Sequence, residues 1–352
     1  LNIIATPESV GVKVEYLNPS FLVKKPRGGH RLVTSFGDVG RYAKPQPSLM
    51  PNIDNTLYEI GQWKHIICTD LSKAFFQIPL SHESRKFCGI VTPFKGVRVY
   101  CRAAMGMPGS ETALEELMCK VVGEFIQKGI AAKIADNLYV GGNTVEELFN
   151  NWECILSSLS ACDLKLSPGQ TTVNPQHVTI LGWIWSNGTL CASKHRITAL
   201  STCVMPETVR QMRGFLGAYK ILARVIPRCS QYLSPLEAMA SNKQSHDKLL
   251  WNDSLVNEFH KAQKALSTNK VIKIPNRASQ LWIVPDGAVR TPGIASTLYI
   301  TRDTAGQAKP KVAGFFSAKL KPNQSRWLPC EIEGLGIAAA VKHWAPYIIQ
   351  SE

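Results

Sequence analysis

A strand that ends on an aspartate constrains this chain more than any other single feature. Residues His65–Asp70 form an apolar β pattern whose alternation places Ile66, Cys68 and Asp70 on one face. We expect the chain to turn into a helix directly afterwards. A carboxylate at the end of an apolar strand is costly to bury unless it is paired or binds a metal ion.

A second aspartate lies in a predicted hairpin, Lys133–Gly142, between two β-forming segments. We expect Asp136 and Asn137 to form its two-residue turn, because Asp and Asn tolerate positive φ. Taken alone, such a pair is more often just a turn. Brought together, Asp70 and Asp136 could hold two Mg²⁺ ions, the arrangement that drives nucleotidyl transfer. The neutral amide of Asn137 is the unexpected residue in such a site.

The charge balance favours a polyanionic partner. The chain has 352 residues, 40 Lys and Arg against 26 Asp and Glu, and a formal net charge of +14. This length predicts two or three domains. Nucleic acid and an anionic membrane surface are both candidate partners, and a basic soluble protein with neither is the third reading. No apolar run is long enough to span a bilayer. Together with the motifs below, this leads us to expect nucleic acid as the partner and no membrane.

The cysteines and the first residue indicate the context of the chain. The ten cysteines stand singly, which argues against a zinc site and favours a reducing, intracellular compartment. Because the chain begins at Leu1 and not at Met, we expect a fragment of a longer protein. The sequence does not indicate an oligomeric state.

Local patterns predict the remaining elements. Phe21–Val33 reads as a basic hairpin around Pro-Arg-Gly-Gly; it suits a triphosphate, although a solvated surface hairpin is the simpler reading. A helix at 109–127 should begin with Ser110 as N-cap and carry Glu111 in its first turn. Its apolar stripe, Leu114 to Phe125, reads as core packing. We expect further helices at 52–62, 145–163, 255–266 and 330–343, and strands at 178–185, 190–192, 281–287, 293–301 and 311–317.

A basic helical segment follows the predicted strands. Residues 194–228 hold seven Lys or Arg and one acid, Glu207. One helical face carries Val209, Met212, Phe215, Leu216 and Tyr219. The segment could grip a duplex backbone, lie on a membrane, or be an ordinary solvated face.

In their order and spacing these motifs resemble the reverse transcriptase of gypsy-like LTR retrotransposons with its tethered RNase H. The matching motifs are Asp70–Phe75, Arg102–Ser110, Ile134–Asn137, Leu164–Pro168 and Leu181–Trp183. The resemblance implies an α+β fold: a right-hand polymerase with fingers, palm and thumb, then a truncated RNase H-like α/β module. The implied domains are fingers and palm at 1–185, thumb at 186–245, a connecting segment at 246–278 and half of the RNase H-like domain at 279–352.

The resemblance also implies a role for each site residue. Asp70 and Asp136, with Asn137 beside them, would form the catalytic centre and bind two Mg²⁺ ions, with Mn²⁺ as an alternative. The nucleotide contacts would be Lys25, Arg31, Leu71, Phe75 and Gly106. The primer grip would be Leu181, Gly182 and Trp183, and the duplex contacts Arg210, Arg213 and Arg224. The partners would be an RNA or DNA template with a DNA primer, and dNTPs, in a cytoplasmic particle or the nucleus.

Two aromatic residues follow Asp70. The ring of Phe75 would lie under the sugar and clash with a ribose 2′-hydroxyl, so deoxynucleotides would be preferred. Ordinary core packing is the competing reading for Phe75, and it suits the neighbouring Phe76 better.

Three departures from the family pattern predict impaired catalysis. Asn137 replaces the second hairpin aspartate, Gln170 stands near a usual lysine, and Ser35–Asp38 replaces a usual Asp-Tyr-Arg stretch. The alternative function is a non-catalytic nucleic-acid-binding relic of a mobile element.

The C-terminal segment carries two candidate RNase H carboxylates. Asp286 follows a strand and Glu333 lies on the next helix, as the first two catalytic acids of that family do; Glu331 reads as a solvated helix charge. The family needs two further aspartates, which the sequence ending at Glu352 does not reach. We therefore expect no RNA cleavage by this segment.

Overall fold

The computed structural model describes residues 2–25, 28–44, 46–47, 52–288, 293–301 and 309–351. The chain divides into two compact units, one of residues 1–59 and 65–175, the other of residues 60–64 and 176–352. This division falls ten residues before the predicted palm–thumb boundary at 185, because the strands after residue 176 pair within the second unit.

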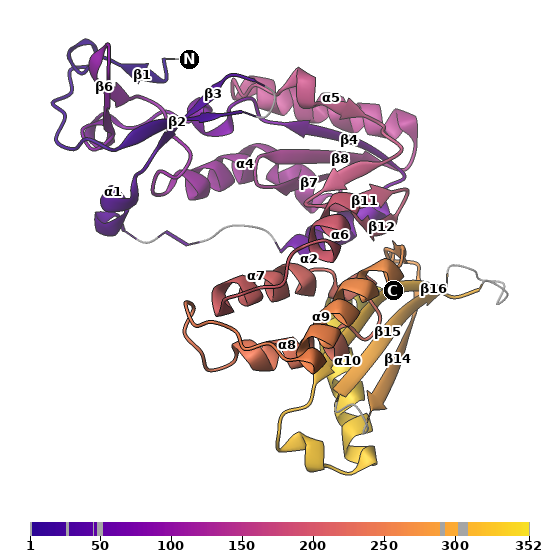
Figure 1. The fold of residues 1–352 in the computed structure, drawn as a ribbon. Coiled ribbons are helices and arrows are strands. Elements are labelled where there is room, and N and C mark those ends of the chain that lie inside the picture. The colour runs from indigo at the N-terminus through magenta and orange to yellow at the C-terminus, as the bar shows by residue number, and fades with distance from the viewer. Residues whose placement is uncertain are drawn as a thin grey trace. The chain divides into compact units, whose positions relative to one another are not determined.

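An antiparallel sheet forms the centre of the first unit, in the order β7 (Ala131–Ile134), β8 (Asn137–Gly142), β4 (His65–Asp70) and β9 (Thr172–Val173). Helices α4 (Ser110–Gln127) and α5 (Val145–Ala161) pack on it (Figure 1). Ile67, Leu138 and Val140 of the sheet meet Met118 and Ile155 of the helices, and each is at most 1% exposed. The predicted apolar stripe of α4 is thus confirmed as core packing.

The N-terminal part of this unit contains small β structures. Strands β2 (Ser20–Lys24) and β3 (His30–Thr34) form the predicted hairpin; Pro26 and Arg27 of its turn lie outside the described residues. A second sheet has the order β1 (Ile4–Ala5), β6 (Gly96–Tyr100), β5 (Gly89–Thr92). The remaining elements before α4 are η1 (Glu8–Val10), α1 (Gly37–Tyr42), α2 (Ile53–Gln62), the 3₁₀ turn η2 (Ala74–Gln77) and α3 (His82–Arg85).

One predicted helix start was wrong. Ser110 is the first residue of α4 and is buried, and Gly109 occupies the N-cap position with a φ of 76°. Glycine adopts this left-handed conformation without the steric penalty that serine would meet. Glu111 lies in the first turn, as predicted.

The second unit begins with a sheet in the order β10 (Val178–Ile180), β11 (Trp183–Ser186), β12 (Thr189–Ala192), β13 (Ile272–Lys273). The single strand predicted at 178–185 is therefore wrong: two strands flank a tight turn at Leu181 and Gly182, which have φ angles of 49° and 79°. Helices α6 (Lys194–Ser201), α7 (Val209–Lys220), α8 (Cys229–Ala240) and α9 (Asp253–Ala265) follow, with short 3₁₀ turns η4 (Ala223–Val225) and η5 (Leu266–Thr268). The predicted apolar face of α7 is buried throughout.

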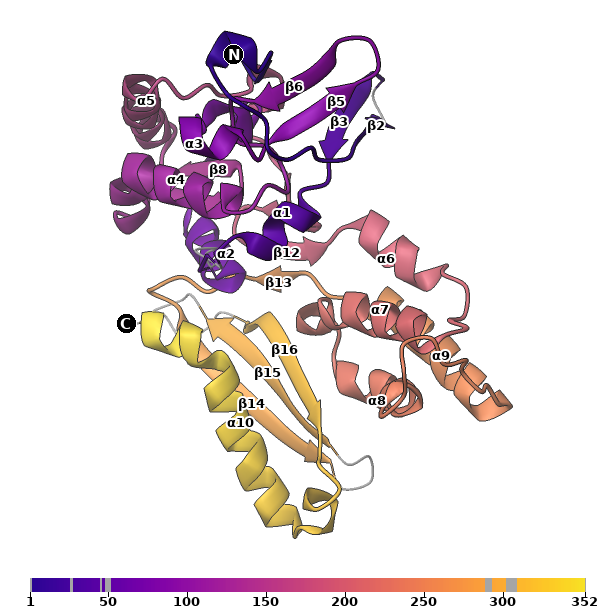
Figure 2. The ribbon, with the colours of Figure 1, turned by 90° about the vertical axis from the view of Figure 1, so that its left-hand side faces the viewer.

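The same unit ends in a three-stranded antiparallel sheet, β14 (Gln280–Ala288), β15 (Gly293–Thr301) and β16 (Lys311–Lys319), followed by η6 (Gln324–Arg326) and α10 (Pro329–Gln350). Helix α10 lies along one face of this sheet (Figure 2), where the Trp344 indole donates to Ser296. Helix α8 contacts β16, and the Ser230 amide donates to the Ser317 hydroxyl.

Candidate functional site

The end of β4 places Asp70 at the centre of the first unit. After Asp70 the chain does not enter an α-helix as predicted but forms the short 3₁₀ turn η2, entered through Lys73 with a φ of 52°. The Ser167 amide donates to the Asp70 carbonyl at 2.8 Å, and the Leu71 amide donates to the Asp136 carbonyl at 3.3 Å. Backbone contacts therefore fix Asp70 between two neighbouring segments.

The hairpin that carries Asp136 differs by one residue from the prediction. Ile134 pairs with Asn137, so the two turn residues are Ala135 and Asp136, and Asn137 is the first residue of β8. Ala135 takes the left-handed conformation, with a φ of 53°. Few alanines adopt this conformation, because the Cβ atom crowds the backbone there.

The structure brings the two aspartates together. Burial, and then the negative charge of Asp136 beside it, raise the pKa of Asp70 to about 6. Asp70 Oδ1 is buried and accepts no hydrogen bond from any described residue. Two adjacent carboxylates, one with an unsatisfied oxygen, fit a divalent cation with a preference for oxygen ligands. Within the described residues no third Asp, Glu, His or Cys joins them to form a larger ligand cluster, so water or substrate oxygens would complete the coordination.

Asn137 lies beside this pair. It is the direct cross-strand partner of Asp70 in the β4–β8 ladder, and its side chain is exposed. Directly opposed residues in an antiparallel pair project from the same face of the sheet. The amide therefore replaces a charge next to the carboxylates, although it does not form the turn.

The other predicted residues of the first unit have different environments. Phe75 packs against the core under the sheet, whereas Phe76 packs against a separate cluster with Phe36 and Tyr100. Leu71 is buried in the same core as Phe75. Gly106 has a φ of 79° and open space where a Cβ would stand, as a glycine turn requires. Gln170 Oε1 accepts a hydrogen bond from the Ser167 hydroxyl.

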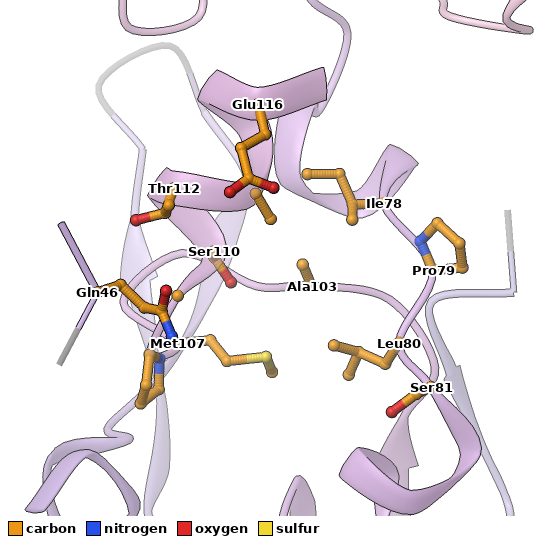
Figure 3. Close-up of a pocket in the computed structure, with 13 residues that line it drawn as sticks. Gln46, Ile78, Pro79, Leu80, Ser81, Ala103, Met107, Ser110, Thr112 and Glu116 are labelled. Atoms are coloured by element: carbon orange, nitrogen blue, oxygen red, sulfur yellow. The ribbon is translucent and has the colours of Figure 1, made fainter. Parts of the chain in front are cut away.

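A cavity of about 280 Å³ is lined in part by residues 107–110, which directly follow Gly106 in the sequence (Figure 3). Ile78, Ala103 and Met107 line it together with Ser110 and Glu116. Its described lining contains a carboxylate and no lysine or arginine, so the cavity does not suit a triphosphate.

The two basic residues predicted to contact a triphosphate lie on the β2–β3 hairpin. Arg31 pairs with Val23, and Lys25 lies two residues after Val23, so alternation places both cations on the same face. Both side chains are exposed.

In the second unit the predicted primer-grip residues form the β10–β11 turn. Trp183 is buried and Leu181 is 45% exposed. The Arg196 guanidinium donates to the Leu181 carbonyl at 2.9 Å and lies where a Cβ on Gly182 would come within 2.8 Å. Sequence reasoning missed Arg196, since nothing in its local pattern separates it from the other basic residues of α6.

The three arginines predicted to contact a duplex have different environments. Arg213 donates hydrogen bonds to the carbonyls of Ala240 and Lys243, and Arg224 lies over the Tyr347 ring at 5.3 Å. Arg210 is exposed, and its side chain makes no hydrogen bond or ion pair with any described residue. Arg213 is exposed as well, so what distinguishes Arg210 is that its guanidinium has no partner among the described residues.

The C-terminal carboxylates also differ from one another. Asp286 Oδ2 forms an ion pair with Arg228 at 2.7 Å. Glu333 is exposed, and its backbone lies against Gly287, the residue after Asp286. Glu331 is exposed, as predicted for a solvated helix charge, and its carboxylate also accepts the Leu328 amide at the start of α10.

Two buried charged residues of the first unit escaped sequence reasoning. Lys133 of β7 and Glu115 of α4 form an ion pair with side chains only 4% and 5% exposed, next to the hairpin turn. The signal was present, because Glu115 falls between Leu114 and Met118 on the apolar stripe of its helix, and Lys133 interrupts a small apolar strand.

Comparison with known proteins agrees with this arrangement. Residues 25–185 match the model of reverse transcriptase (RNA-dependent DNA polymerase), and residues 251–352 match that of the RNase H-like domain found in reverse transcriptase. Such domains typically depend on divalent metal ions, in agreement with the pairing of Asp70 and Asp136. No helix of the described residues is long and apolar enough to cross a membrane.

Curated relatives and solved structures extend the match over nearly the whole chain. The Pol polyprotein from the Drosophila melanogaster transposon opus is 20% identical over 346 residues, covering 95% of this chain and 34% of that protein. The Pol polyprotein of feline endogenous virus ECE1 is 24% identical over 324 residues, covering 89% and 30%. The foamy viral protease–reverse transcriptase in complex with double-stranded DNA superposes with a TM-score of 0.84 at 16% identity, covering 98% of this chain and 58% of that one.

These matches confirm the predicted fold, a reverse transcriptase followed by an RNase H-like module. The chain spans about a third of the length of the curated relatives. The chain therefore contains a reverse transcriptase domain followed by an RNase H-like domain of the kind found in reverse transcriptases, and its homologues are retrotransposon and retroviral Pol polyproteins.

Proposed function

We propose that this chain is the polymerase region of a gypsy-like LTR retrotransposon and performs RNA-directed DNA synthesis at a rate lowered by Asn137. The observation that carries the proposal is the pairing of Asp70 with Asp136 at a buried carboxylate oxygen that has no partner among the described residues; burial, and then the charge of Asp136, raise the pKa of Asp70 to about 6. Neighbouring carboxylates destabilise one another unless a cation lies between them.

Asp70 and Asp136 are the residues that would hold two Mg²⁺ ions, with Mn²⁺ as an alternative. Such ions, when bound, activate the attacking hydroxyl and offset the charge of the leaving group. The Leu71 backbone, anchored on Asp136, keeps the two acids in register. Lys25 and Arg31, on one face of their hairpin, would attract the triphosphate of a dNTP, and Phe75 with Gly106 would shape the sugar pocket.

The proposed substrates are a primer annealed to an RNA or DNA template. Solved relatives of this fold are complexes with double-stranded DNA and with an RNA/DNA hybrid. Leu181, Gly182 and Trp183 would grip the primer, with Arg196 supporting their turn. Arg210 would contact the duplex backbone. We propose residues 1–185 as fingers and palm, 186–245 as thumb, 246–278 as connecting segment and 279–352 as RNase H-like, in a cytoplasmic particle or the nucleus.

Asn137 favours one alternative, a nucleic-acid-binding relic without efficient chemistry. Its amide stands directly opposite Asp70, where a carboxylate would add charge to the metal site. An amide is a weaker ligand for Mg²⁺ than a carboxylate. The basic surface would bind template and primer in either case.

Primer extension separates the two readings. The full chain is incubated with a labelled primer on an RNA and on a DNA template, with Mg²⁺ or Mn²⁺, and Asp70→Asn serves as the inactive control. Metal-dependent extension that disappears in Asp70→Asn supports the polymerase. Binding of the primer–template without extension, even in Asn137→Asp, would establish the relic.

A further inference from the structure

A buried cation supports the turn that carries Asp136. The Lys133 ammonium lies 2.5 Å from Glu115 Oε1 and 2.7 Å from the Ala135 carbonyl oxygen. Both ionic side chains are almost completely buried. The cation of β7 therefore joins helix α4 to the hairpin turn.

The free energy needed to bury the Lys133–Glu115 ion pair suggests that it does more than stabilise the fold. Removing two charges from water carries a penalty that their mutual attraction often fails to recover, and an apolar pair of similar volume is commonly as stable. An apolar pair could not, however, supply the hydrogen bond from Lys133 to the Ala135 carbonyl. Ala135 has a left-handed backbone that alanine disfavours, and such a conformation persists only where its surroundings enforce it.

The contacts fix both peptide groups that flank Asp136. Lys133 holds the carbonyl of Ala135, which belongs to the peptide group before Asp136. The Leu71 amide holds the carbonyl of Asp136, which belongs to the peptide group after it. With both peptide planes anchored, the direction of the Asp136 side chain is set toward Asp70.

We propose that Lys133 and Glu115 are positioning residues, which hold the Ala135–Asp136 turn so that the Asp136 carboxylate stays beside Asp70. This inference deepens the proposed function, since it concerns the same metal site, but it assigns the residues a task separate from stability. Glu115 orients the ammonium, and Lys133 transmits that orientation to the turn.

Two double variants separate positioning from stability. Lys133→Met with Glu115→Leu fills the space with apolar atoms and removes the donor to Ala135. Lys133→Gln with Glu115→Gln removes the charges but keeps an N–H donor. Lys128→Met, which breaks the exposed ion pair with Glu124 on the same helix, is the matched control. Global unfolding, Mn²⁺ affinity by calorimetry and hydrogen exchange of the Leu71 amide are measured for each full-length protein.

The apolar pair should keep global stability yet lose about tenfold in Mn²⁺ affinity, which is about 1.4 kcal/mol, and its Leu71 amide should exchange faster. The amide pair should retain much of both properties. Adding Ala135→Gly to the apolar pair should restore part of the loss, because glycine adopts the turn conformation unaided. Lys128→Met should match the parent protein.

The inference fails if the apolar pair folds and keeps both the parental Mn²⁺ affinity and the parental exchange rate. Should the apolar pair not fold, Lys133→Met is compared with Lys133→Gln, which keeps an N–H donor, and equal Mn²⁺ affinity and exchange in these two would contradict it as well. If the parent protein binds no Mn²⁺, the proposed function is refuted, while exchange at Leu71 still tests the positioning of the turn.

Discussion

Asn137 is the direct partner of Asp70 in the β4–β8 ladder and lies one residue beyond the turn formed by Ala135 and Asp136. The hairpin therefore presents one carboxylate from its turn and one amide from its first strand residue to the same aspartate. Asn137 therefore lacks a negative charge beside Asp70 and Asp136, although the hairpin backbone forms as the site requires.

Replacement of Asn137 by Asp should restore catalysis. The new carboxylate would face Asp70 and strengthen metal binding, so we expect single-nucleotide extension with Mg²⁺ to rise at least about tenfold, equivalent to about 1.4 kcal/mol of barrier. Asn137→Ser, which adds no charge, is the control. Equal rates in Asn137→Asp and the parent protein would show that Asn137 is not a defect.

Asp70 should make stability depend on pH in the absence of metal. Because burial and Asp136 raise its pKa from 3.8 to about 6, the folded state favours the protonated acid. This contribution is fully present below about pH 4 and is lost as pH rises through about 6. Asp70→Asn, which mimics the protonated form, should therefore be more stable than the parent at pH 8 in EDTA, by about 1 kcal/mol after allowance for solvent screening.

Thermal unfolding between pH 4 and 8 checks this expectation. The difference between Asp70→Asn and the parent should shrink toward pH 4, and Mn²⁺ at pH 8 should stabilise the parent alone. A parent protein that gains stability over the same interval would contradict the assignment.

Phe75 should select the sugar of the incoming nucleotide. In the Asn137→Asp background, Phe75→Val should raise ribonucleotide relative to deoxynucleotide incorporation by about tenfold, equivalent to about 1.4 kcal/mol. Phe76→Val is the control, because Phe76 packs against a separate cluster. The same ratio in both variants would remove Phe75 from this role.

Substitution of Glu331 and of Glu333 should affect stability differently. Glu331 caps α10 by accepting the Leu328 amide at 2.8 Å, so Glu331→Ala should lower the free energy of unfolding by about 1 kcal/mol. Glu333 is exposed, and Glu333→Ala should leave stability unchanged while it removes a candidate RNase H carboxylate. Urea unfolding of both variants, together with hydrogen exchange in the first turn of α10, measures these two effects on stability. A larger loss in Glu333→Ala would reverse the assignment.

Local patterns predicted most elements of this fold but could not determine register. Turn propensity favoured Asp136-Asn137, yet the pairing of Ile134 with Asn137 moves the turn back by one residue onto an alanine. Tertiary contacts hold this turn: the Leu71 amide donates to the Asp136 carbonyl, and Lys133, which donates to the Ala135 carbonyl, is itself paired with Glu115 of α4. Local patterns could not predict the contacts with Leu71 and Glu115, because these residues are distant from the turn in sequence.

The same limit applies to the charged residues. Sequence reasoning identified Asp70 and Asp136 because motif order fixes them, but it treated three arginines of the basic segment alike. Their contacts differ: Arg213 donates to carbonyls of α8 and of the loop after it, and Arg224 lies over the Tyr347 ring, whereas the exposed Arg210 side chain has no partner among the described residues. Partners that come from elsewhere in the chain determine which cation is available to a ligand.

Arg210 should contribute to nucleic-acid affinity through charge alone. We expect the logarithm of affinity for a primer–template duplex to fall linearly with the logarithm of salt concentration, and Arg210→Ala to flatten that slope by about 0.9 if the side chain neutralises one phosphate. The effect should be similar for unrelated duplex sequences.

Arg213→Ala is the matched variant from the same helix. Because Arg213 is tied to Ala240 and Lys243, its loss should lower stability by about 1 kcal/mol and change the slope less. Fluorescence anisotropy across a salt series, with unfolding measured in parallel, tests both. An unchanged slope in Arg210→Ala, or stronger binding of the parent to anionic vesicles than to duplex, would assign this surface to another partner.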